Sequence, residues 1–400
     1  MYDQSVEENF LIQKFREYYE KNTICSVNQI DKREFGYGVF KRKIANRNLA
    51  FANEFAMNLF LRQRTPLFFS YSNSCYAFPG NTPMANKQWL SSDIIYEFDA
   101  DEIKNNCEKI NGEWKCTKTF GEESKVKETI QGKETKQWFL EDSLKQTKKQ
   151  VFRLADLIEN DFGFLKENIS INFSGKAGYH MHLRNKEIQL LNKKSRIELV
   201  DYIAGYGIDY VNLGYEFEKQ LICPKNGFWV KRINVALKDF FRKDSKEISL
   251  ITLLSKTKIN QILKSREEII NGIDQGYLFS VGARTNKDFW KKVFDFAVQT
   301  VMIPIDRQTS IDLHKIIRVP NTLHGETGFV AKELSLDKLE SFDPFIDAIA
   351  FDATLTKIFV SETPKFKLNG INFGPFKEEN IEVPLYCAIF LLGKGVAKIV

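Results

Sequence analysis

Residues 170–183 read SINFSGKAGYHMHL, and they give the clearest indication of the chain's architecture. Residues 170–173 and 179–183 are rich in aliphatic and aromatic side chains, a composition that favours strands. Residues 175–178 (GKAG) carry a glycine at either end and predict the turn between the two strands. The sequence therefore predicts two consecutive strands joined by a glycine-bracketed turn.

The turn and the second strand carry polar groups that suit a phosphate. Glycine permits positive φ angles and a close approach of the backbone to an anion, as at Gly175. Ser174 offers a hydroxyl donor, and Lys176 offers a positive charge to triphosphate oxygens. His180 and His182 share one face, because side chains alternate along a strand. A His-x-His zinc site is one alternative, and a buried structural position for His182 is another.

A second stretch, residues 93–99 (DIIYEFD), predicts a strand that carries acids on one face. Glu97 and Asp99 point the same way, with Asp101 beyond them if the strand continues. Two carboxylates at this spacing can share divalent cations, and Asp306, at the end of another apolar segment, is the candidate for a third acid. The alternative is that acids at a strand end are merely solvated.

A third stretch, residues 306–328, reads DRQTSIDLHKIIRVPNTLHGETG. We expect a strand over 301–305, and then a short helix over 311–318 that Ser310 caps. Arg318 and His324 are placed to meet phosphate or ribose oxygens if the turn after the helix folds over the carboxylates. An ordinary helix-to-loop transition with solvated charges is the alternative.

Hydrophobic periodicity predicts the remaining organisation. Helices are expected at 8–21, 48–64 and 141–160, a hairpin-like stretch at 33–40, a loop at 72–88 and an insertion at 103–140. Residues 187–295 are predicted to be mostly helical, with one helix opened by the capping-box spacing of 195–198 and closed by Gly205 and Gly207. We predict an α+β fold: a mixed α/β core formed by 1–186 and 296–400, and an inserted helical subdomain at 187–295.

Composition limits the class of protein. The 400 residues carry a net charge of +6 and are 43% hydrophobic, which is ample for a core and compatible with a nucleic-acid partner. The six cysteines are scattered, which predicts a reduced, intracellular protein. The acidic, polar N-terminus is not a signal peptide, and the longest apolar run, 385–392, is too short to span a bilayer. We therefore expect a soluble, cytoplasmic protein that does not bind membranes.

Together these motifs resemble the small, catalytic subunit of archaeal and eukaryotic DNA primases, in its archaeal form. The likeness runs along almost the whole chain. Its collinear matches fall at 33–36, 89–99, 161–163, 174–182, 200–202, 306–328, 374–376 and 383–386.

The resemblance implies a DNA-directed primase, a nucleotidyltransferase that makes short RNA or DNA primers from nucleoside triphosphates on a single-stranded DNA template. It implies two-metal chemistry with Mg²⁺ or Mn²⁺, a primase α/β catalytic core, and a primase large subunit as partner in a heterodimer. It places Glu97, Asp99 and Asp306 at the catalytic, metal-binding positions. The nucleotide-binding positions that it implies are Ser174, Gly175, Lys176, His180, Arg318 and His324.

Three departures from the family pattern stand out. Glu97 replaces an aspartate at the first metal position, and Ala177 stands where the turn usually carries an arginine. The family also has a zinc knuckle after the acidic strand, of which Cys107 and Cys116 remain. Two thiolates do not fill a tetrahedral site, so we predict no stable zinc and treat the two cysteines as relics.

Three other functions stay open at this stage. A repair-type, gap-filling polymerase of the same superfamily would extend ends and initiate weakly. A non-catalytic nucleic-acid-binding subunit would keep the fold, with Glu97 marking lost chemistry. A metallohydrolase built on His180 and His182 would cleave phosphodiesters rather than build them.

Overall fold

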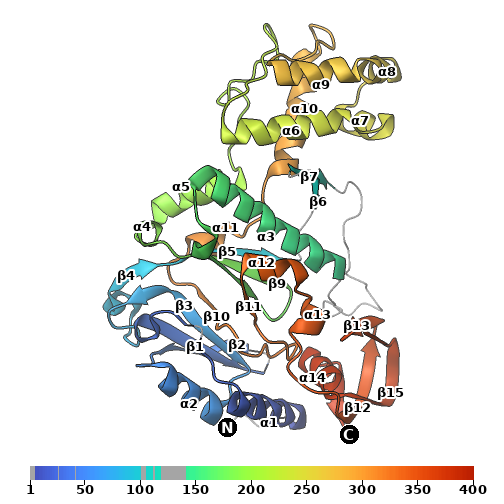
Figure 1. Cartoon of the computed structure of the whole chain (residues 1–400). Coiled ribbons are helices and arrows are strands. Elements are labelled where there is room, and N and C mark those ends of the chain that lie inside the picture. The colour runs from blue at the N-terminus through green and yellow to red at the C-terminus, as the bar shows by residue number, and fades with distance from the viewer. Residues whose placement is uncertain (1–4, 26, 41, 101–104, 111–112, 119–140) are drawn as a thin grey trace.

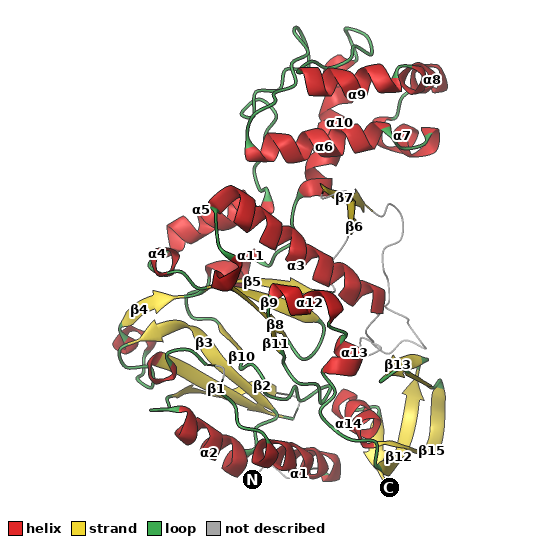
Figure 2. Ribbon diagram, in the orientation of Figure 1, coloured by secondary structure: helices red, strands yellow, loops and turns green. Residues whose placement is uncertain are grey.

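The computed structural model describes residues 5–25, 27–40, 42–100, 105–110, 113–118 and 141–400. Helices and antiparallel sheets are mixed along the chain, as Figure 2 shows, so the predicted α+β class is confirmed. Two antiparallel sheets lie at the centre of the fold. Helices cover their outer faces, and a helical block stands apart from them at the top of Figure 1.

The first sheet is built from N-terminal strands and one strand that returns from late in the chain. Its order is β10 (Ile316–Arg318), β3 (Phe68–Tyr76), β1 (Arg33–Val39) and β2 (Arg42–Leu49), and β4 (Trp89–Ser92) also pairs with β3. Two helices, α1 (Val6–Lys21) and α2 (Glu54–Arg64), pack below it. They contribute buried Phe15 and Leu61 to the core that also holds Phe35 and Phe69.

The second sheet carries the predicted motifs. Its order is β11 (Glu333–Leu334), β8 (Ile169–Phe173), β9 (Gly178–Leu183) and β5 (Ile94–Asp99). The amphipathic helix α3 (Glu141–Phe162) lies across one face and buries Val151, Leu154 and Ile158. The predicted strands at 93–99, 170–173 and 179–183, and the predicted helix at 141–160, are therefore confirmed within one or two residues.

Other predicted elements are wrong or shifted. The stretch 72–88 is not all loop, because β3 continues to Tyr76 and is buried throughout. The helix expected at 48–64 begins only at Glu54, after the N-cap Asn53. Residues 301–305 form no strand, and 311–318 is not a helix but the end of α11 (Arg307–Ile311) followed by β10. The helix expected to open at Ser195 opens earlier, capped by Asn192, and closes at Gly205 as predicted.

The middle of the chain is largely helical. Its helices are α4 (Lys186–Gln189), α5 (Lys193–Ala204), α6 (Phe228–Phe241), α7 (Ser245–Thr252), α8 (Lys256–Lys264), α9 (Arg266–Gln275) and α10 (Asn286–Val301). Buried residues between Tyr215 and Val298 form a hydrophobic cluster distinct from the main core. The domain boundaries at 187 and 295 stay a prediction.

The C-terminal part forms a small sheet and a buried helix. The sheet order is β15 (Phe376–Pro384), β12 (Leu355–Thr363) and β16 (Ala397–Ile399), beside the hairpin β13 (Phe366–Leu368) and β14 (Ile371–Phe373). The apolar run at 385–392 lies inside α14 (Leu385–Lys394), which is almost wholly buried. Two short helices, α12 (Leu336–Ser341) and α13 (Pro344–Asp347), lie between β11 and this part. Across the described segments, no helix is long and apolar enough to cross a membrane.

The insertion expected at 103–140 falls mostly outside the described residues. Within it, β6 (Asn105–Ile110) and β7 (Glu113–Lys118) pair as an antiparallel hairpin. The backbone register sets Cys107 directly opposite Cys116. Whether these residues hold zinc stays a prediction.

Candidate active site

Glu97 and His180 face each other across β5 and β9. The strand register pairs Glu97 with His180, and the Glu97 Oε1 atom lies 3.2 Å from the His180 Nε2 atom. Residues directly opposite in an antiparallel pair point to the same face of the sheet. The acidic strand and the glycine-turn motif, which lie about eighty residues apart in the sequence, therefore meet on one surface.

Asp99 extends this surface by two residues along β5. Its strand partner is Gly178, where an added Cβ would lie 2.5 Å from the Asp99 Oδ1 atom. A side chain at position 178 would therefore displace the Asp99 carboxylate, so glycine makes room for the acid. Asp101, which the strand pattern also singled out, lies outside the described residues.

Asp306 reaches the same surface from late in the chain. Its backbone N–H donates to the Glu97 carbonyl at 3.3 Å. Its Oδ1 atom accepts hydrogen bonds from the backbone N–H groups of Gln308 at 2.8 Å and Thr309 at 3.3 Å, so Asp306 is the N-cap of α11. The expected cap at Ser310 is therefore wrong by four residues, and the cap residue is the acid itself.

Thr309 lies between the two carboxylates. Its Oγ1 atom is 2.8 Å from Glu97 Oε2 and 2.5 Å from Asp306 Oδ2. A hydroxyl has a single proton and can donate to only one of these oxygens at a time. Because each oxygen is within hydrogen-bond reach of the same atom, the two carboxylates converge on one point.

A lysine also approaches this point. The Lys315 Nζ atom donates to Thr309 Oγ1 at 2.9 Å and lies 3.3 Å from Glu97 Oε2. Burial by itself would raise the pKa of Glu97. The hydrogen bond and electrostatic attraction of His180, followed by those of Lys315 and Thr309, outweigh burial and hold the pKa of this carboxyl well below its usual range.

The chemistry of these donors suits a hard divalent cation. Carboxylate oxygens are the ligands that Mg²⁺ and Mn²⁺ prefer, and Glu97 and Asp306 already converge. As the side chains stand, however, the described residues contain no group of three or more His, Cys, Asp or Glu side chains arranged to hold a metal ion. The two converging carboxylates fit such an ion, and Asp99 on the same strand face is the nearest third donor in sequence.

The glycine turn packs against the turn that follows β10. Gly175 has a φ of +79°, and an added Cβ would lie 2.8 Å from the Cβ of His324. The Thr327 hydroxyl donates to the Gly175 carbonyl at 2.6 Å, and Ser174 Oγ accepts from the backbone N–H of Lys176 at 3.3 Å. The two predicted phosphate-binding turns are thus in direct contact. Their close approach requires a glycine at position 175.

Arg318 is a partly buried cation that forms no ion pair with a carboxylate among the described residues. Its guanidinium carbon lies 5.0 Å from the centroid of the Phe68 ring, and its Nε and Nη1 atoms are buried with no hydrogen-bond acceptor. Burial lowers the pKa of Arg318 to about 10. His324 packs edge-on against the same ring, and burial, with the charges of Arg318 and Lys176 nearby, holds its pKa well below the usual value. An anion bound here would accept hydrogen bonds from the guanidinium and offset the cost of its burial.

Further polar atoms are unpaired on β8 and β9. The side-chain amide of Asn172, the Nδ1 atom of His180 and both ring nitrogens of His182 are buried and have no hydrogen-bond partner among the residues that the structure describes. Asn172 stands opposite His180 in the register, on the face that carries Glu97. Burial holds the pKa of His182 well below its usual value, so this ring is neutral at pH 7. Unpaired buried polar atoms are rare, so this face calls for waters or a ligand.

Lys176 is the predicted turn residue whose charge is already paired. Its Nζ atom lies 2.6 Å from Glu326 Oε2, and both side chains are partly exposed. Burial alone would raise the pKa of Glu326, but the hydrogen bond and charge of Lys176 lower it. A phosphate that binds Lys176 must therefore compete with this carboxylate.

The structure brings the predicted residues into two contiguous groups. Glu97, Asp99, His180 and Asp306 surround the carboxylate site, while Ser174, Gly175, Lys176, Arg318 and His324 lie along the two contacting turns. The sequence interpretation missed Thr309 as the group between the acids, and Glu326 as the partner of Lys176. Asp306-x-x-Thr309 has the spacing of a capped helix start, which is the signal that would have found Thr309.

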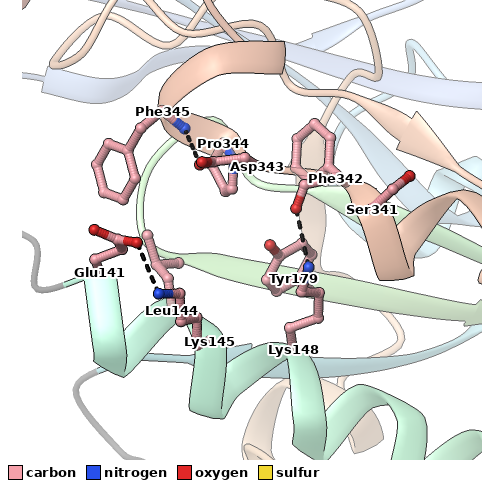
Figure 3. Close-up of a pocket in the computed structure, with 10 residues that line it drawn as sticks. All are labelled: Glu141, Leu144, Lys145, Lys148, Tyr179, Ser341, Phe342, Asp343, Pro344 and Phe345. Atoms are coloured by element: carbon pink, nitrogen blue, oxygen red, sulfur yellow. Dashed lines mark hydrogen bonds and ion pairs between the residues drawn. The ribbon is translucent and has the colours of Figure 1, made fainter. Parts of the chain in front are cut away.

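A separate pocket of about 140 Å³ opens on the other face of the second sheet, beside α3 (Figure 3). Its lining includes Tyr179, Lys148 and Asp343. Tyr179 and His180 are neighbours on β9 and point to opposite faces, so the pocket lies away from Glu97. It is also smaller than the roughly 300 Å³ at which small-molecule sites begin. The pocket therefore lies apart from the carboxylate pair and the two contacting turns.

Comparison with known proteins places these motifs in a family context. The family model described as DNA primase small subunit matches residues 141–336. That segment holds the glycine turn, the helical block, Asp306, Arg318 and His324, whereas the strand with Glu97 and Asp99 precedes it.

Individual relatives align with nearly the whole chain. A protein named DNA primase small subunit PriS from Methanococcoides burtonii is 28% identical over 414 residues, covering 97% of each chain. The proteins of the same name from Thermoplasma acidophilum and Nitrosopumilus maritimus are 27% and 26% identical. The alignment with the Thermoplasma protein covers 97% of this chain and 99% of the relative, and the alignment with the Nitrosopumilus protein covers 98% of each.

Proposed function

We propose that this chain is a DNA primase small subunit and acts as the catalytic subunit of a primase, because the family model matches residues 141–336 and proteins of that name align with nearly the whole chain. The reaction is template-directed synthesis of short RNA or DNA primers from nucleoside triphosphates on single-stranded DNA. One observation carries the proposal: the carboxylates of Glu97 and Asp306 converge on Thr309, on the sheet face that also carries His180.

We assign the binding of divalent cations to Glu97, Asp99 and Asp306, with Mg²⁺ or Mn²⁺ as the ions that oxygen donors favour. When bound, such cations lower the pKa of the attacking hydroxyl and neutralise charge on the reacting phosphate. Glu97 stays ionised across the physiological range, because its pKa is held low. Its hydrogen bond to His180 fixes the direction in which the carboxylate points.

We assign the triphosphate to the two contacting turns. Ser174 accepts backbone hydrogen bonds and keeps its hydroxyl proton available to donate to a phosphate oxygen. Arg318 supplies a guanidinium whose buried Nε and Nη1 atoms have no acceptor among the described residues, and Lys176 supplies a second cation. His324, neutral and packed against Gly175, holds the two turns together and lines the phosphate path.

The partners follow from the same proposal. A primase needs a single-stranded DNA template, nucleoside triphosphates and, in this family, a large subunit. The described residues provide the carboxylates and the phosphate turns, and a large subunit would act during initiation, when two nucleotides must be held at once.

The experiment is primer synthesis by the purified chain, given unprimed single-stranded DNA, labelled nucleoside triphosphates, and Mg²⁺ or Mn²⁺. The matched control is Asp306→Asn. Asparagine caps a helix as well as aspartate does, so this variant keeps the start of α11 while it removes the charge. Short products from the natural chain that fall at least about a hundredfold in the variant would support the proposal.

Other outcomes would separate the alternatives. Extension of a supplied primer without synthesis on unprimed template would point to a gap-filling polymerase or to initiation that needs the large subunit. Single-strand binding without any incorporation, in either cation, would overturn the enzymatic proposal in favour of a non-catalytic subunit.

A further inference from the structure

The backbone of residues 312–315 is fixed against β3 by hydrogen bonds to its carbonyls. Asn73 Nδ2 donates to the Asp312 carbonyl at 2.7 Å, and the backbone N–H of Asn73 donates to the Lys315 carbonyl at 3.0 Å. Ser74 and Tyr76 both donate to the Leu313 carbonyl. This segment is therefore held rigidly at the edge of the first sheet.

A further bond completes the attachment. Arg47 Nη2 donates to the His314 carbonyl at 3.0 Å, so every carbonyl from 312 to 315 has a donor from the first sheet. Polar side chains in a buried strand are costly unless they are hydrogen-bonded, and these bonds give the Asn73 amide and the Ser74 and Tyr76 hydroxyls of β3 an acceptor. The consequence is that Lys315 starts from a fixed backbone position beside the carboxylates.

From that position the Lys315 ammonium reaches the point where Glu97 and Asp306 converge. It lies 2.9 Å from Thr309 Oγ1 and 3.3 Å from Glu97 Oε2, and its side chain is one-third exposed. Two carboxylates near one point repel each other, and a cation beside them offsets that repulsion. The ammonium contacts Glu97 directly and the hydroxyl of Thr309, which both carboxylates approach, so it lies where the proposed function assigns a divalent cation.

We propose that Lys315 is a resident counter-cation of this carboxylate pair, which a divalent cation must displace, so that Lys315 sets the metal affinity of the site. The inference rests on the proposed function. Lys315 is a positioning residue here: it holds Glu97, through Thr309, in place while the site is free of metal. It also raises the cation concentration at which the site fills, because binding breaks its ion pair.

The test measures Mn²⁺ binding to the whole chain directly, from the electron paramagnetic resonance signal of free Mn²⁺, without nucleotide or DNA. Lys315→Met keeps the length of the side chain and removes the charge. We expect it to bind Mn²⁺ about tenfold more tightly, the change that a unit charge at this distance implies at a partly exposed site. Lys315→Arg keeps the charge and should stay close to the natural chain.

A second measurement separates this role from a merely structural one. In the absence of metal, Lys315→Met should melt at a lower temperature, because the carboxylates lose their counter-charge. Saturating Mn²⁺ should then raise its melting temperature by more than it raises that of the natural chain. Lys264→Met on exposed α8 makes the same change in net charge far from the site and should alter neither quantity.

The results distinguish a failure of the Lys315 inference from a failure of the proposed function. If the natural chain binds Mn²⁺ and Asp306→Asn abolishes that binding, while Lys315→Met binds equally or more weakly, the inference falls and the proposed function stands. If Asp306→Asn binds Mn²⁺ as the natural chain does, these carboxylates are not the metal site, and both fall. Tighter binding together with a larger Mn²⁺-induced rise in melting temperature supports the inference.

Discussion

Single side chains in this site are held in their charge states by specific neighbours. Glu97 is ionised because His180, Lys315 and Thr309 outweigh its burial, whereas His324 is neutral because burial and nearby cations act together. The sequence predicted both residues as members of the site. It could not predict these charge states, because they depend on burial and on partners distant in the sequence, such as His180 for Glu97 and Lys176 for His324.

The low pKa of Glu97 makes stability depend on pH in a defined direction. The pKa is lower in the folded chain than the ordinary value near 4.3 of the unfolded chain, so the ionised group stabilises the fold above that value. The contribution is lost as the pH falls toward the folded pKa. We expect Glu97→Gln to lower the free energy of unfolding by about 1–3 kcal/mol at pH 6, and by progressively less as the pH falls below about 4 toward the folded pKa.

Urea unfolding of both chains at several pH values measures this difference. A gap between the two chains that stays constant from pH 6 to pH 3 would show that Glu97 is not held ionised by its neighbours.

Glu326 should limit phosphate binding at Lys176. The pair is short, at 2.6 Å, but partly exposed, so its contribution is at most about 1 kcal/mol. Glu326→Gln should therefore strengthen binding of a fluorescent nucleoside triphosphate by up to about fivefold. Lys176→Met is the matched opposite change and should weaken binding. Weaker binding in Glu326→Gln would instead show that the carboxylate orients Lys176 for the ligand.

At the scale of secondary structure, the elements with a regular pattern were predicted and those with buried polar residues were not. The strands β5, β8 and β9 alternate or carry aromatic runs, and α3 has one apolar face. By contrast, β3 reads FFSYSNSCY, and its polar second half looks like a loop in sequence. Its partners are carbonyls some 240 residues later, which no local pattern shows.

The sequence pattern also did not predict the helix that begins after Asp306. Residues 301–305 are apolar because they complete α10 and lead into the core, and not because they form a strand. The side chain of Asp306, by capping α11, then starts a helix where the sequence interpretation ended a strand.

Because Asp306 is the N-cap of α11, its replacement by asparagine and its replacement by alanine should affect stability differently. Asp306→Asn should change the free energy of unfolding by less than about 0.5 kcal/mol, whereas Asp306→Ala should lower it by about 1 kcal/mol, because alanine cannot accept the backbone N–H bonds. Both variants should lose Mn²⁺ binding. Chemical denaturation and Mn²⁺ titration of the two variants give the comparison, and equal stabilities would contradict the capping role.

At the scale of the whole molecule, α3 connects the second sheet to the helical block. Near its middle, Arg153 donates to the carbonyls of Thr300 and Val301 at the end of α10. At its C-terminal end, the buried carboxylate of Asp161 accepts both Nη atoms of Arg232 from α6, at 2.6 and 2.8 Å. Two helices of the block are therefore attached to one helix of the core.

Breaking the second attachment should loosen the block without unfolding the site. Asp161→Asn removes a carboxylate that is 1% exposed and leaves the Arg232 charge without its partner, at a cost of about 3 kcal/mol. Hydrogen exchange should accelerate in α6 and α10 and stay unchanged in β5 and β9. The control is Asp274→Asn, which breaks an exposed pair with Lys238 inside the block and should have little effect. Equal acceleration in both variants would show that the attachment is not at Asp161.

The two acids of the carboxylate pair differ in how freely they can be exchanged. Glu97 lies within β5, the edge strand of the second sheet, and among the described residues its carboxylate contacts the side chains of His180, Thr309 and Lys315. An acid with one methylene instead of two would differ there mainly in its reach. Asp306 is also bound by two backbone amides, and glutamate is not among the side chains that cap a helix well. In a library in which each position carries all twenty residues, variants that retain primer synthesis should have either aspartate or glutamate at position 97. At position 306 they should have aspartate alone.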